Sequence, residues 1–256
     1  MRRAVRLVDN VAVRQAVSAF AAEPAQRSAL EVLRSCMYGE LLFDITGSDG
    51  AADGSFAAGS RLQIRRGTGP GGGSALFAFT RNEEIARLYP LGTRTQSLVT
   101  PATGALELAR HHGDAWLYID PAGPTCALSA AEIDFALRNP RNEPLKDALA
   151  ALQAGRVNRL DVLTVLRQEG PLLLAADDRA VPGKVIKRSV TMPDGSTALL
   201  GFTSAAEVVA SDPSDAVAAF TTAQVLEMVR RDGYSGLIID PAEPSITVAL
   251  AELAAT

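Results

Sequence analysis

The chain has 256 residues, of which 47% are hydrophobic, 21% are charged and only 5% are aromatic, with a mean hydropathy of +0.11. This composition excludes a disordered chain, and the length allows one large globular domain or two small ones. A formal net charge of −4 gives no general attraction to nucleic acid or to an anionic membrane, so nucleic acid is not expected as a partner.

The first residues, MRRAVRLVDNVAVRQAV, begin with a basic pair. Arg6, Asp9 and Arg14 interrupt any apolar stretch that a secretory signal would need. The sequence also lacks a run of about 18 uncharged apolar residues, so no membrane insertion is expected. We therefore expect a cytoplasmic protein, and export without a cleavable signal stays open.

The first half of the chain alternates helical and strand patterns. Hydrophobic periodicity and turn residues indicate the elements in chain order. They are helices at 11–21 and 28–37, a strand at 41–45, a glycine-rich stretch at 47–74, a hairpin ending in Phe79, a short helix, a strand at 95–99, a helix ending at Gly113 and the strand AWLYI.

The second half repeats this order, which indicates a duplicated module. Residues 108–125, LARHHGDAWLYIDPAGPT, and residues 228–245, MVRRDGYSGLIIDPAEPS, are identical at 8 of 18 positions without a gap. The boundary is predicted at the polar, proline-containing RNPRNEP. The predicted modules are residues 1–138, with the glycine-rich insert 47–74, and residues 142–256.

The fold class is therefore α/β with a mixed sheet, in two tandem modules. Each module is expected to hold N-terminal helices, a β-hairpin and a βαβ unit, because a strand, a helix of about three turns and another strand indicate a parallel crossover. The turn MPDGS is predicted to join the second hairpin. Helix starts are predicted at four caps: Thr80 with Glu83, Ser204 with Glu207, Thr100–Pro101, and Thr221–Thr222. Helix ends are predicted at Gly113 and Gly233, and a further capping box at Ser129 with Glu132.

The phrase Asp-Pro-Ala-x-Pro ends the last predicted parallel strand of both halves. The proline stops the strand, should hold the preceding aspartate in extended geometry, and leaves its carboxylate to accept bonds from the turn that follows. Because ligands bind at the carboxyl ends of parallel strands, a catalytic or metal role is the alternative. We favour a structural or interaction turn, with the candidate residues Asp120, Pro121, Pro124, Asp240, Pro241 and Pro244.

Other motifs favour structural interpretations over catalytic, cofactor or metal sites. The only histidines, His111 and His112, align with Arg231 and Asp232 and suit the end of a helix. GTGPGGGS lacks the Gly-Lys-Ser/Thr ending of a phosphate loop and is predicted as a flexible hairpin loop. Two further features stay structural: Cys36 and Cys126 as buried apolar side chains of a reduced protein, and KVIKRSV as a half-exposed strand.

These parts, taken in order, resemble a known family. A hairpin ending in AFT or GFT, a short acidic helix, a crossover unit and then G…L.IDPA.P resemble the N-terminal SseB domain, present twice, best at residues 76–133 and 199–253. The resemblance implies a link to serine sensitivity or to secretion, and it supplies no catalytic residues to transfer. With the preference for arginine over lysine, it implies a bacterial, actinobacterial-like source. The glycine-rich insert of the first copy departs from the family pattern.

Two classes of function follow from these observations. The first is a non-enzymatic interaction protein that binds an unidentified protein partner or associates with itself, because structural signals are duplicated and no catalytic set is. The alternative is an amino-acid-binding regulator or enzyme, with a pocket near the Asp-Pro-Ala-x-Pro turns.

Overall fold

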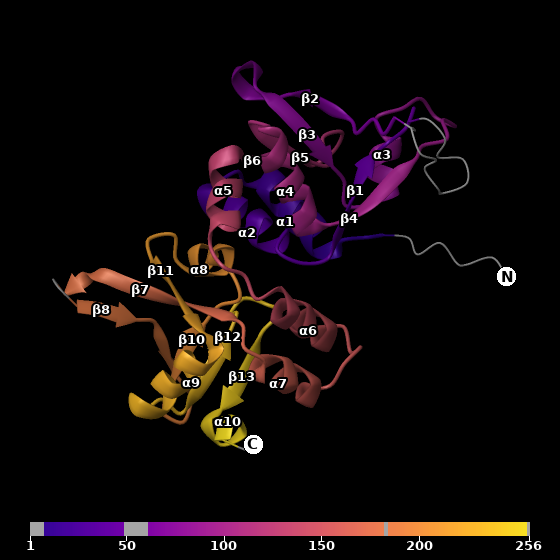
Figure 1. The fold of residues 1–256 in the computed structure, drawn as a ribbon. Helices are drawn as coiled ribbons and strands as arrows, with labels where there is room; N and C mark the ends of the chain where they lie inside the picture. Colours follow the sequence, from indigo (N-terminus) through magenta and orange to yellow (C-terminus); the bar gives the residue numbers. More distant parts are fainter. Residues whose placement is uncertain (1–7, 49–60, 182–183, 255–256) are drawn as a thin grey trace. The chain divides into compact units, whose positions relative to one another are not determined.

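The computed structural model describes residues 8–48, 61–181 and 184–254 (Figure 1). The chain divides into two compact units, Met1–Asp134 and Phe135–Thr256. Within each unit, helices pack against mixed β-structure, which confirms the predicted α/β class.

Unit 1 begins with a pair of helices that contact each other. Its helices are α1 (Val11–Ala22), α2 (Gln26–Ser35), α3 (Asn82–Ala86), α4 (Ala102–His112) and α5 (Ala130–Arg138), the last running past the unit boundary. Its strands are β1 (Glu40–Asp44), β2 (Arg66–Thr68), β3 (Ser74–Ala78), β4 (Ser97–Pro101), β5 (Trp116–Ile119) and β6 (Cys126–Ser129), with the 3-10 turn η2 (Pro70–Gly72) between β2 and β3.

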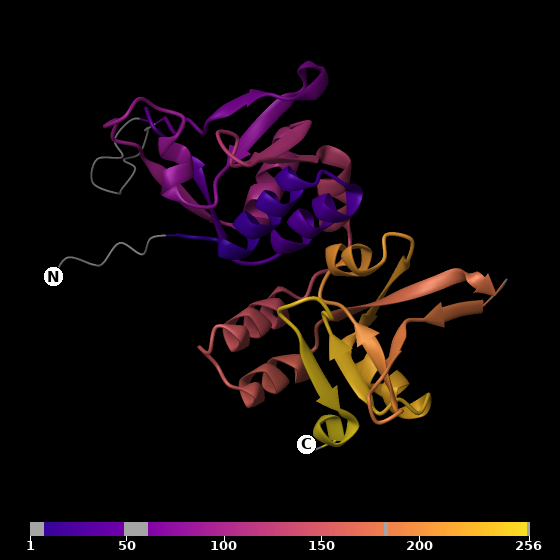
Figure 2. The same cartoon turned by 180° about the vertical axis from the view of Figure 1, so that it is seen from behind.

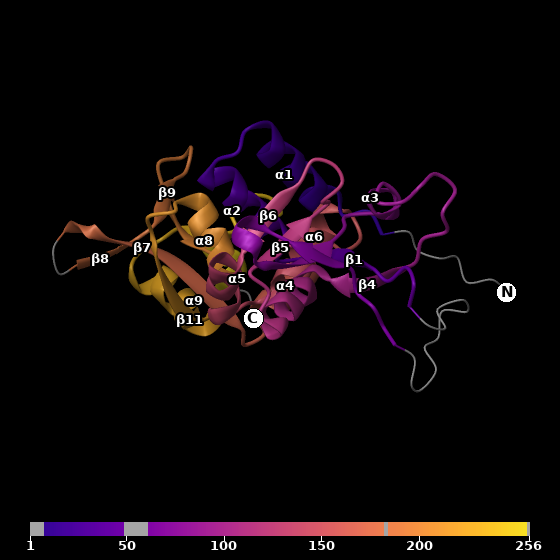
Figure 3. The same ribbon diagram turned by 90° about the horizontal axis from the view of Figure 1, so that it is seen from above.

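Unit 2 repeats this order. Its helices are α6 (Glu143–Gln153), α7 (Arg159–Arg167), α8 (Ala205–Ser211), α9 (Thr222–Arg231) and α10 (Leu250–Ala254). Its strands are β7 (Pro171–Val181), β8 (Lys184–Lys187), β9 (Ser189–Thr191), β10 (Thr197–Gly201), β11 (Ala216–Thr221), β12 (Gly236–Ile239) and β13 (Ile246–Ala249). Figure 2 shows the pair α6 and α7 side by side, and Figures 1 and 3 show the β7–β8 hairpin projecting from the rest of this unit.

The sheet topology is similar in both units, and the difference among the described strands is the additional strand β8 of unit 2. In unit 1 the strand orders are β4 beside β1, and β2-β3-β5-β6, joined by a bridge between Leu42 and Phe79. In unit 2 the orders are β11-β7-β8 and β13-β12-β10-β9, joined by a bridge between Leu173 and Phe202. The parallel pairs are β3 with β5 and β10 with β12, and the other pairs are antiparallel.

The parallel pairing differs in one respect from the prediction. The strands directly before the long helices, β4 and β11, do not pair with the strands after them. They pair antiparallel with β1 and β7, and the parallel partner of the later strand is the hairpin strand β3 or β10. The crossover is therefore longer than one helix, since it also contains α3 or α8 and the outlying strand.

Alternate residues of β7 build the two hydrophobic cores of unit 2, as the period of two in a strand requires. Leu172 and Leu174 belong to a core with α6, α7 and α9. Leu173 and Ala175 belong to a second core with Phe202 and α8, against which Phe135 packs. The sheet is thus covered on both faces, and its central strands read as continuous apolar runs.

Most of the predicted helix ends are confirmed. The side chain of Ser204 caps α8, and Thr221 forms a capping box with Gln224 at the start of α9. Gly113 and Gly233 have φ of 68° and 75°, the left-handed backbone that follows a helix. Two further signals are confirmed: the turn between Met192 and Ser196, and the bonds that link Ser129 with Glu132.

Two predicted caps in unit 1 are wrong. Helix α3 starts after Arg81, which makes no side-chain capping bond, because Thr80 is used elsewhere. Helix α4 starts after Pro101, again without a side-chain cap, so Pro101 and not Thr100 corresponds to Thr221.

Part of the glycine-rich insert, residues 49–60, lies outside the described residues. The rest includes the hairpin from β2 to β3, where Gly71 and Gly72 have φ of 67° and 78°. A strand follows this turn rather than a helix, which excludes a phosphate loop here.

Candidate functional site at the carboxyl ends of the parallel strands

Asp120 and Asp240 directly follow the parallel strands β5 and β12. Their backbones are left-handed, with φ of 53° and 48°, so the predicted extended geometry before the proline is wrong. Aspartate tolerates this region better than most residues with a Cβ atom. The left-handed backbone accompanies a side chain that bonds to a threonine just after an earlier strand instead of to the following turn.

Each carboxylate is held by one threonine. In unit 1 the Thr80 N–H donates to Asp120 Oδ1 at 2.9 Å and the Thr80 hydroxyl donates to Oδ2 at 2.7 Å. In unit 2 Thr203 donates in the same way to Asp240, at 2.8 and 2.6 Å. We call this pair of bonds the Asp–Thr clamp.

The clamp ties the ends of the two parallel strands together. Thr80 and Thr203 lie two residues after β3 and β10, and the N–H groups of Asp120 and Asp240 donate to the last residues of those strands, Ala78 and Gly201, at 3.0 Å. The prediction that the carboxylate serves the following turn is therefore wrong. Its donors lie 40 and 37 residues earlier in the chain.

The prolines of the phrase lie in the turns that follow. Pro121 is half-buried and Pro124 is exposed, whereas Pro241 is exposed and Pro244 is buried. In unit 1 the turn is closed by a bond from the Gly123 N–H to the Asp120 carbonyl at 3.1 Å. The prolines border the clamp without contributing a donor or an acceptor to it.

Unit 2 adds a buried ammonium to the clamp. Lys146, on α6, donates from Nζ to Asp240 Oδ2 at 2.9 Å and to Glu207 Oε1 at 2.5 Å. The side chains of Lys146, Glu207 and Asp240 are 2%, 1% and 0% exposed. The lysine therefore links three elements, α6, α8 and the end of β12, through charges removed from water.

Unit 1 lacks this ammonium. The residue that aligns with Lys146 is Arg14, which pairs instead with Asp9 at 3.1 Å, where both side chains are partly exposed. In the part of the chain that the structure describes, no lysine or arginine donates to Asp120. Glu84, the counterpart of Glu207, pairs with Arg81 at 2.8 Å and with Arg87 at 2.7 Å.

This difference is reflected in the protonation of the two sites. Burial is the largest influence on Asp120 and raises its pKa to about 6, against the two bonds from Thr80, which lower it. Burial by itself lowers the pKa of Lys146, but the attraction of Asp240 and Glu207 outweighs burial and the pKa is raised. Lys146 is thus charged, which suits the two carboxylates around it.

The two cysteines also differ from reactive thiols. Cys36 and Cys126 are free and buried. Burial raises the pKa of Cys126 to about 12, and it raises the pKa of Cys36 further, with added repulsion from Cys126 and Asp120. Both therefore stay protonated at neutral pH, as a structural role requires.

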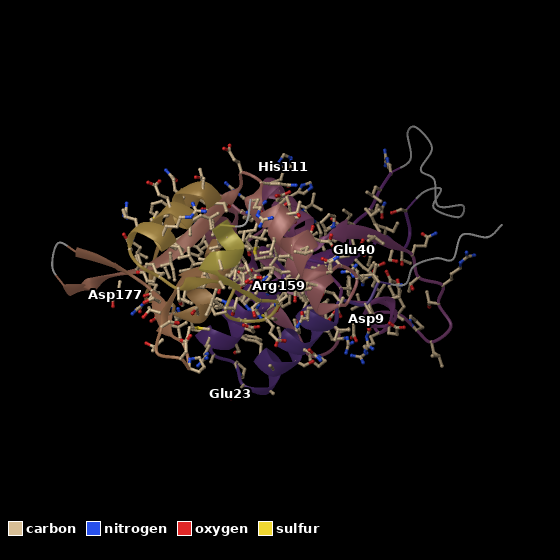
Figure 4. All side chains as sticks on the ribbon, turned by 90° about the horizontal axis from the view of Figure 1, so that it is seen from below. Asp9, Glu23, Glu40, His111, Arg159 and Asp177 are labelled. Carbon is tan, nitrogen blue, oxygen red and sulfur yellow. The ribbon has the colours of Figure 1, made fainter. Side chains whose placement is uncertain are left out.

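The histidine pair has a simple place in the fold. His111, labelled in Figure 4, and His112 end α4, directly before Gly113. The helix dipole favours basic side chains at this end of a helix. Among the described residues, no group of three or more His, Cys, Asp or Glu side chains is arranged to hold a metal ion. Within the same ranges, no helix combines the length and apolar character that crossing a membrane requires.

The roles of four residues of the site were missed by sequence reasoning. Thr80 and Thr203 stand in the shared phrases AFT and GFT, and a threonine retained in both halves was the available signal. Glu207 was interpreted only as a capping residue. Lys146 lies next to Leu145 on the buried face of an amphipathic helix, and a lysine at such a position indicates a buried acidic partner.

Fold and site together define a class: a tandem α/β protein in which the same strand-end clamp occurs twice and the surrounding charges differ. The family model of the SseB protein N-terminal domain matches residues 13–134 and again residues 145–255. The chain therefore belongs to the SseB family, with two copies of that domain in tandem. Neither the curated proteins nor the solved structures contain a match.

Proposed function

We propose that this SseB-family protein is a non-enzymatic interaction module that binds a protein partner or a second copy of itself. One observation carries the proposal. The polar feature common to both units at the strand ends is the Asp–Thr clamp, and its carboxylates are only 2% and 0% exposed. A carboxylate closed by two intramolecular bonds serves the scaffold, and it is poorly placed to meet a substrate.

The groups around the clamp support the same proposal. A reaction shared by both units would need a shared set of reactive groups, but Lys146 is replaced by Arg14, and Cys36 and Cys126 occur in unit 1 alone. What the two units have in common is backbone geometry, packing and the buried clamp with a glutamate nearby, Glu84 or Glu207. Duplication then supplies two similar surfaces, which suits binding better than catalysis.

Two further expectations accompany the proposal. The first is a cytoplasmic location in a bacterial cell. The second, implied by the family, is a connection to secretion or to serine sensitivity. Cell fractionation, and the growth of a deletion strain on added serine, test these expectations separately.

The proposal is tested by affinity capture of the full chain from its native host, together with size-exclusion chromatography and light scattering of the purified protein. We expect a specific protein partner or a defined oligomer. A strictly monomeric chain without any partner would contradict the proposal. A thermal-shift screen against amino acids, serine included, provides the opposing test: a saturable shift that Asp240→Asn abolishes would favour the small-molecule alternative.

A further inference from the structure

Two of the outer strands of unit 2, β13 and β11, differ in whether side chains bond to their free backbone groups. On β13, the Arg159 guanidinium donates to the Thr247 carbonyl, and the Ala249 N–H donates to Glu252 at 2.9 Å. Arg159 and Glu252 also pair with each other at 2.8 Å, and Figure 4 labels Arg159. Side chains of unit 2 thus bond to the backbone N–H and C=O groups of β13 that another strand would need for pairing.

On the outer strand β11, the backbone edge is not closed in this way. Leu173 of β7 exchanges two bonds of 2.8 Å with Phe202, so Leu173 faces β10 and its neighbours Leu172 and Leu174 face β11. Since Ala218 lies opposite Leu174, the alternation of an antiparallel ladder turns Val217 and Ala219 outward. Within the described residues, the N–H and C=O groups of these two residues meet no partner, whereas the Thr221 N–H donates to Gln224 at 2.9 Å.

β11 also lacks the features that usually protect an edge strand. Its sequence, AVAAFT, contains no charge and no proline, and its register with β7 runs over six residues without a bulge. Both faces of the strand are already used, because Phe220 packs on one core and Val217 on the other. The unused part is the backbone edge, and its natural occupant is another extended strand.

We infer that β11 pairs antiparallel with β11 of a second copy of this chain, about a twofold axis at Ala218. This inference rests on the proposed function and names the partner and the surface. In that register Val217 of one copy lies opposite Ala219 of the other, so the outward groups of both residues satisfy each other in four hydrogen bonds. An isologous contact of this kind closes on itself and forms a dimer rather than a fibre.

Charge complementarity favours this edge and this occupant. An antiparallel pairing brings the turn before β11 of one copy, which contains Asp212, toward the first turn of α9 of the other, a helix amino terminus without an acidic residue of its own. Asp212 keeps 42% of its side chain exposed and pairs with Arg188 at 3.3 Å. The same arginine also pairs with Asp177 and Asp215, so this group of side chains keeps an excess of negative charge. The equivalent pairing of β4 in unit 1 would place the exposed Arg94 beside the first turn of α4, where a cation opposes the helix dipole.

The test compares the full chain with two proline variants in light scattering over a range of concentrations. Ala219→Pro removes an outward N–H and leaves the ladder to β7 intact. Val99→Pro makes the matched change in β4, since Val99 lies opposite Leu42 as Ala219 lies opposite Leu173. We expect a wild-type dimer, a folded Ala219→Pro monomer with dimerisation weakened at least about tenfold, and an unchanged Val99→Pro dimer.

Three results would overturn the inference: a wild-type chain monomeric at every concentration, an Ala219→Pro dimer as strong as wild type, or loss of the dimer in Val99→Pro alone. A monomer that still captures a protein partner would reject self-pairing and leave the proposed function standing. If Ala219→Pro does not fold, hydrogen exchange of wild type decides. Protection of the Val217 and Ala219 amides must rise with protein concentration, and protection independent of concentration rejects the pairing.

Discussion

Asp120 and Asp240 occupy the same place in two copies of one fold and accept the same two bonds from a threonine. Of the two, only Asp240 accepts a hydrogen bond from a buried ammonium group, that of Lys146. In unit 1 the corresponding helix directs an arginine to the surface. The comparison separates what the fold needs, which is the clamp, from what one copy has added, which is an ion pair that ties α6 to the clamp.

The largest expected difference comes from Lys146→Met. This change leaves Glu207 and Asp240 buried without their cation, and breaking a buried pair by removing one partner costs about 3–5 kcal/mol. Hydrogen exchange of unit 2 peptides, measured by mass spectrometry in the intact chain, should show the loss of stability. The matched control is Arg14→Met, whose partly exposed pair with Asp9 should contribute at most about 1 kcal/mol to unit 1. Equal effects of the two changes would contradict the comparison.

The pH dependence of unit 1 provides a second test. The pKa of Asp120 is raised from 3.8 to about 6 by burial, so the folded state binds this proton more tightly than the unfolded state. Its contribution is therefore fully present below about pH 4 and is lost as the pH rises through about 6. The loss amounts to about 3 kcal/mol at most.

Unfolding of wild type and Asp120→Asn between pH 4 and 7, followed by the fluorescence of Trp116, isolates this effect. Trp116 is the only tryptophan and lies in β5 of unit 1. The free energy of unfolding of wild type, relative to Asp120→Asn, should fall over this range. A rising difference would show that the pKa of Asp120 is lowered by folding.

The hydroxyl of the clamp should matter in both units. Thr80→Val and Thr203→Val keep the backbone donor and remove the hydroxyl donor to a buried carboxylate. A bond to a charged group contributes about 1.5–3 kcal/mol. The loss should be smaller for Thr203→Val, because Lys146 still donates to the same Oδ2 atom of Asp240. Urea unfolding with exchange readouts for each unit measures both, and a larger loss in unit 2 would argue against this compensation.

The smallest effect is expected at the start of the long helices. Thr221→Ala removes a cap that accepts the Gln224 N–H at 3.2 Å, which should cost about 1 kcal/mol. Thr100→Ala, one residue before the corresponding position in unit 1, should change the stability by less than about 0.5 kcal/mol. Protection of the first amides of α9 and α4 distinguishes the two.

Much of the fold could be predicted because its signals are local. The order of the elements, the glycine at each helix end and the caps at Ser204 and Thr221 depend on neighbouring residues. Which strands pair could not be read in this way. β5 pairs with β3 across an intervening helix, strand and helix, and periodicity records burial but not the partner.

The candidate site was predicted in position but not in chemistry. The repeated phrase pointed to Asp120 and Asp240, yet the threonines that bond to them are 40 and 37 residues earlier in the sequence. Lys146 and Asp240 are separated by 94 residues in the sequence. The interpretation of these aspartates as turn residues assumed hydrogen-bond partners in the neighbouring turn only. A single sequence gives no sign of contacts that arise from packing helices onto a sheet.

The central claim is that both units share the clamp and that only unit 2 couples it to a buried cation. Two double-mutant cycles test it most directly, one joining Lys146→Met with Asp240→Asn and the other joining Arg14→Met with Asp120→Asn. We predict a coupling energy of about 1–3 kcal/mol in unit 2 and a value within about 0.5 kcal/mol of zero in unit 1. Comparable coupling in both units, or none in unit 2, would contradict the account.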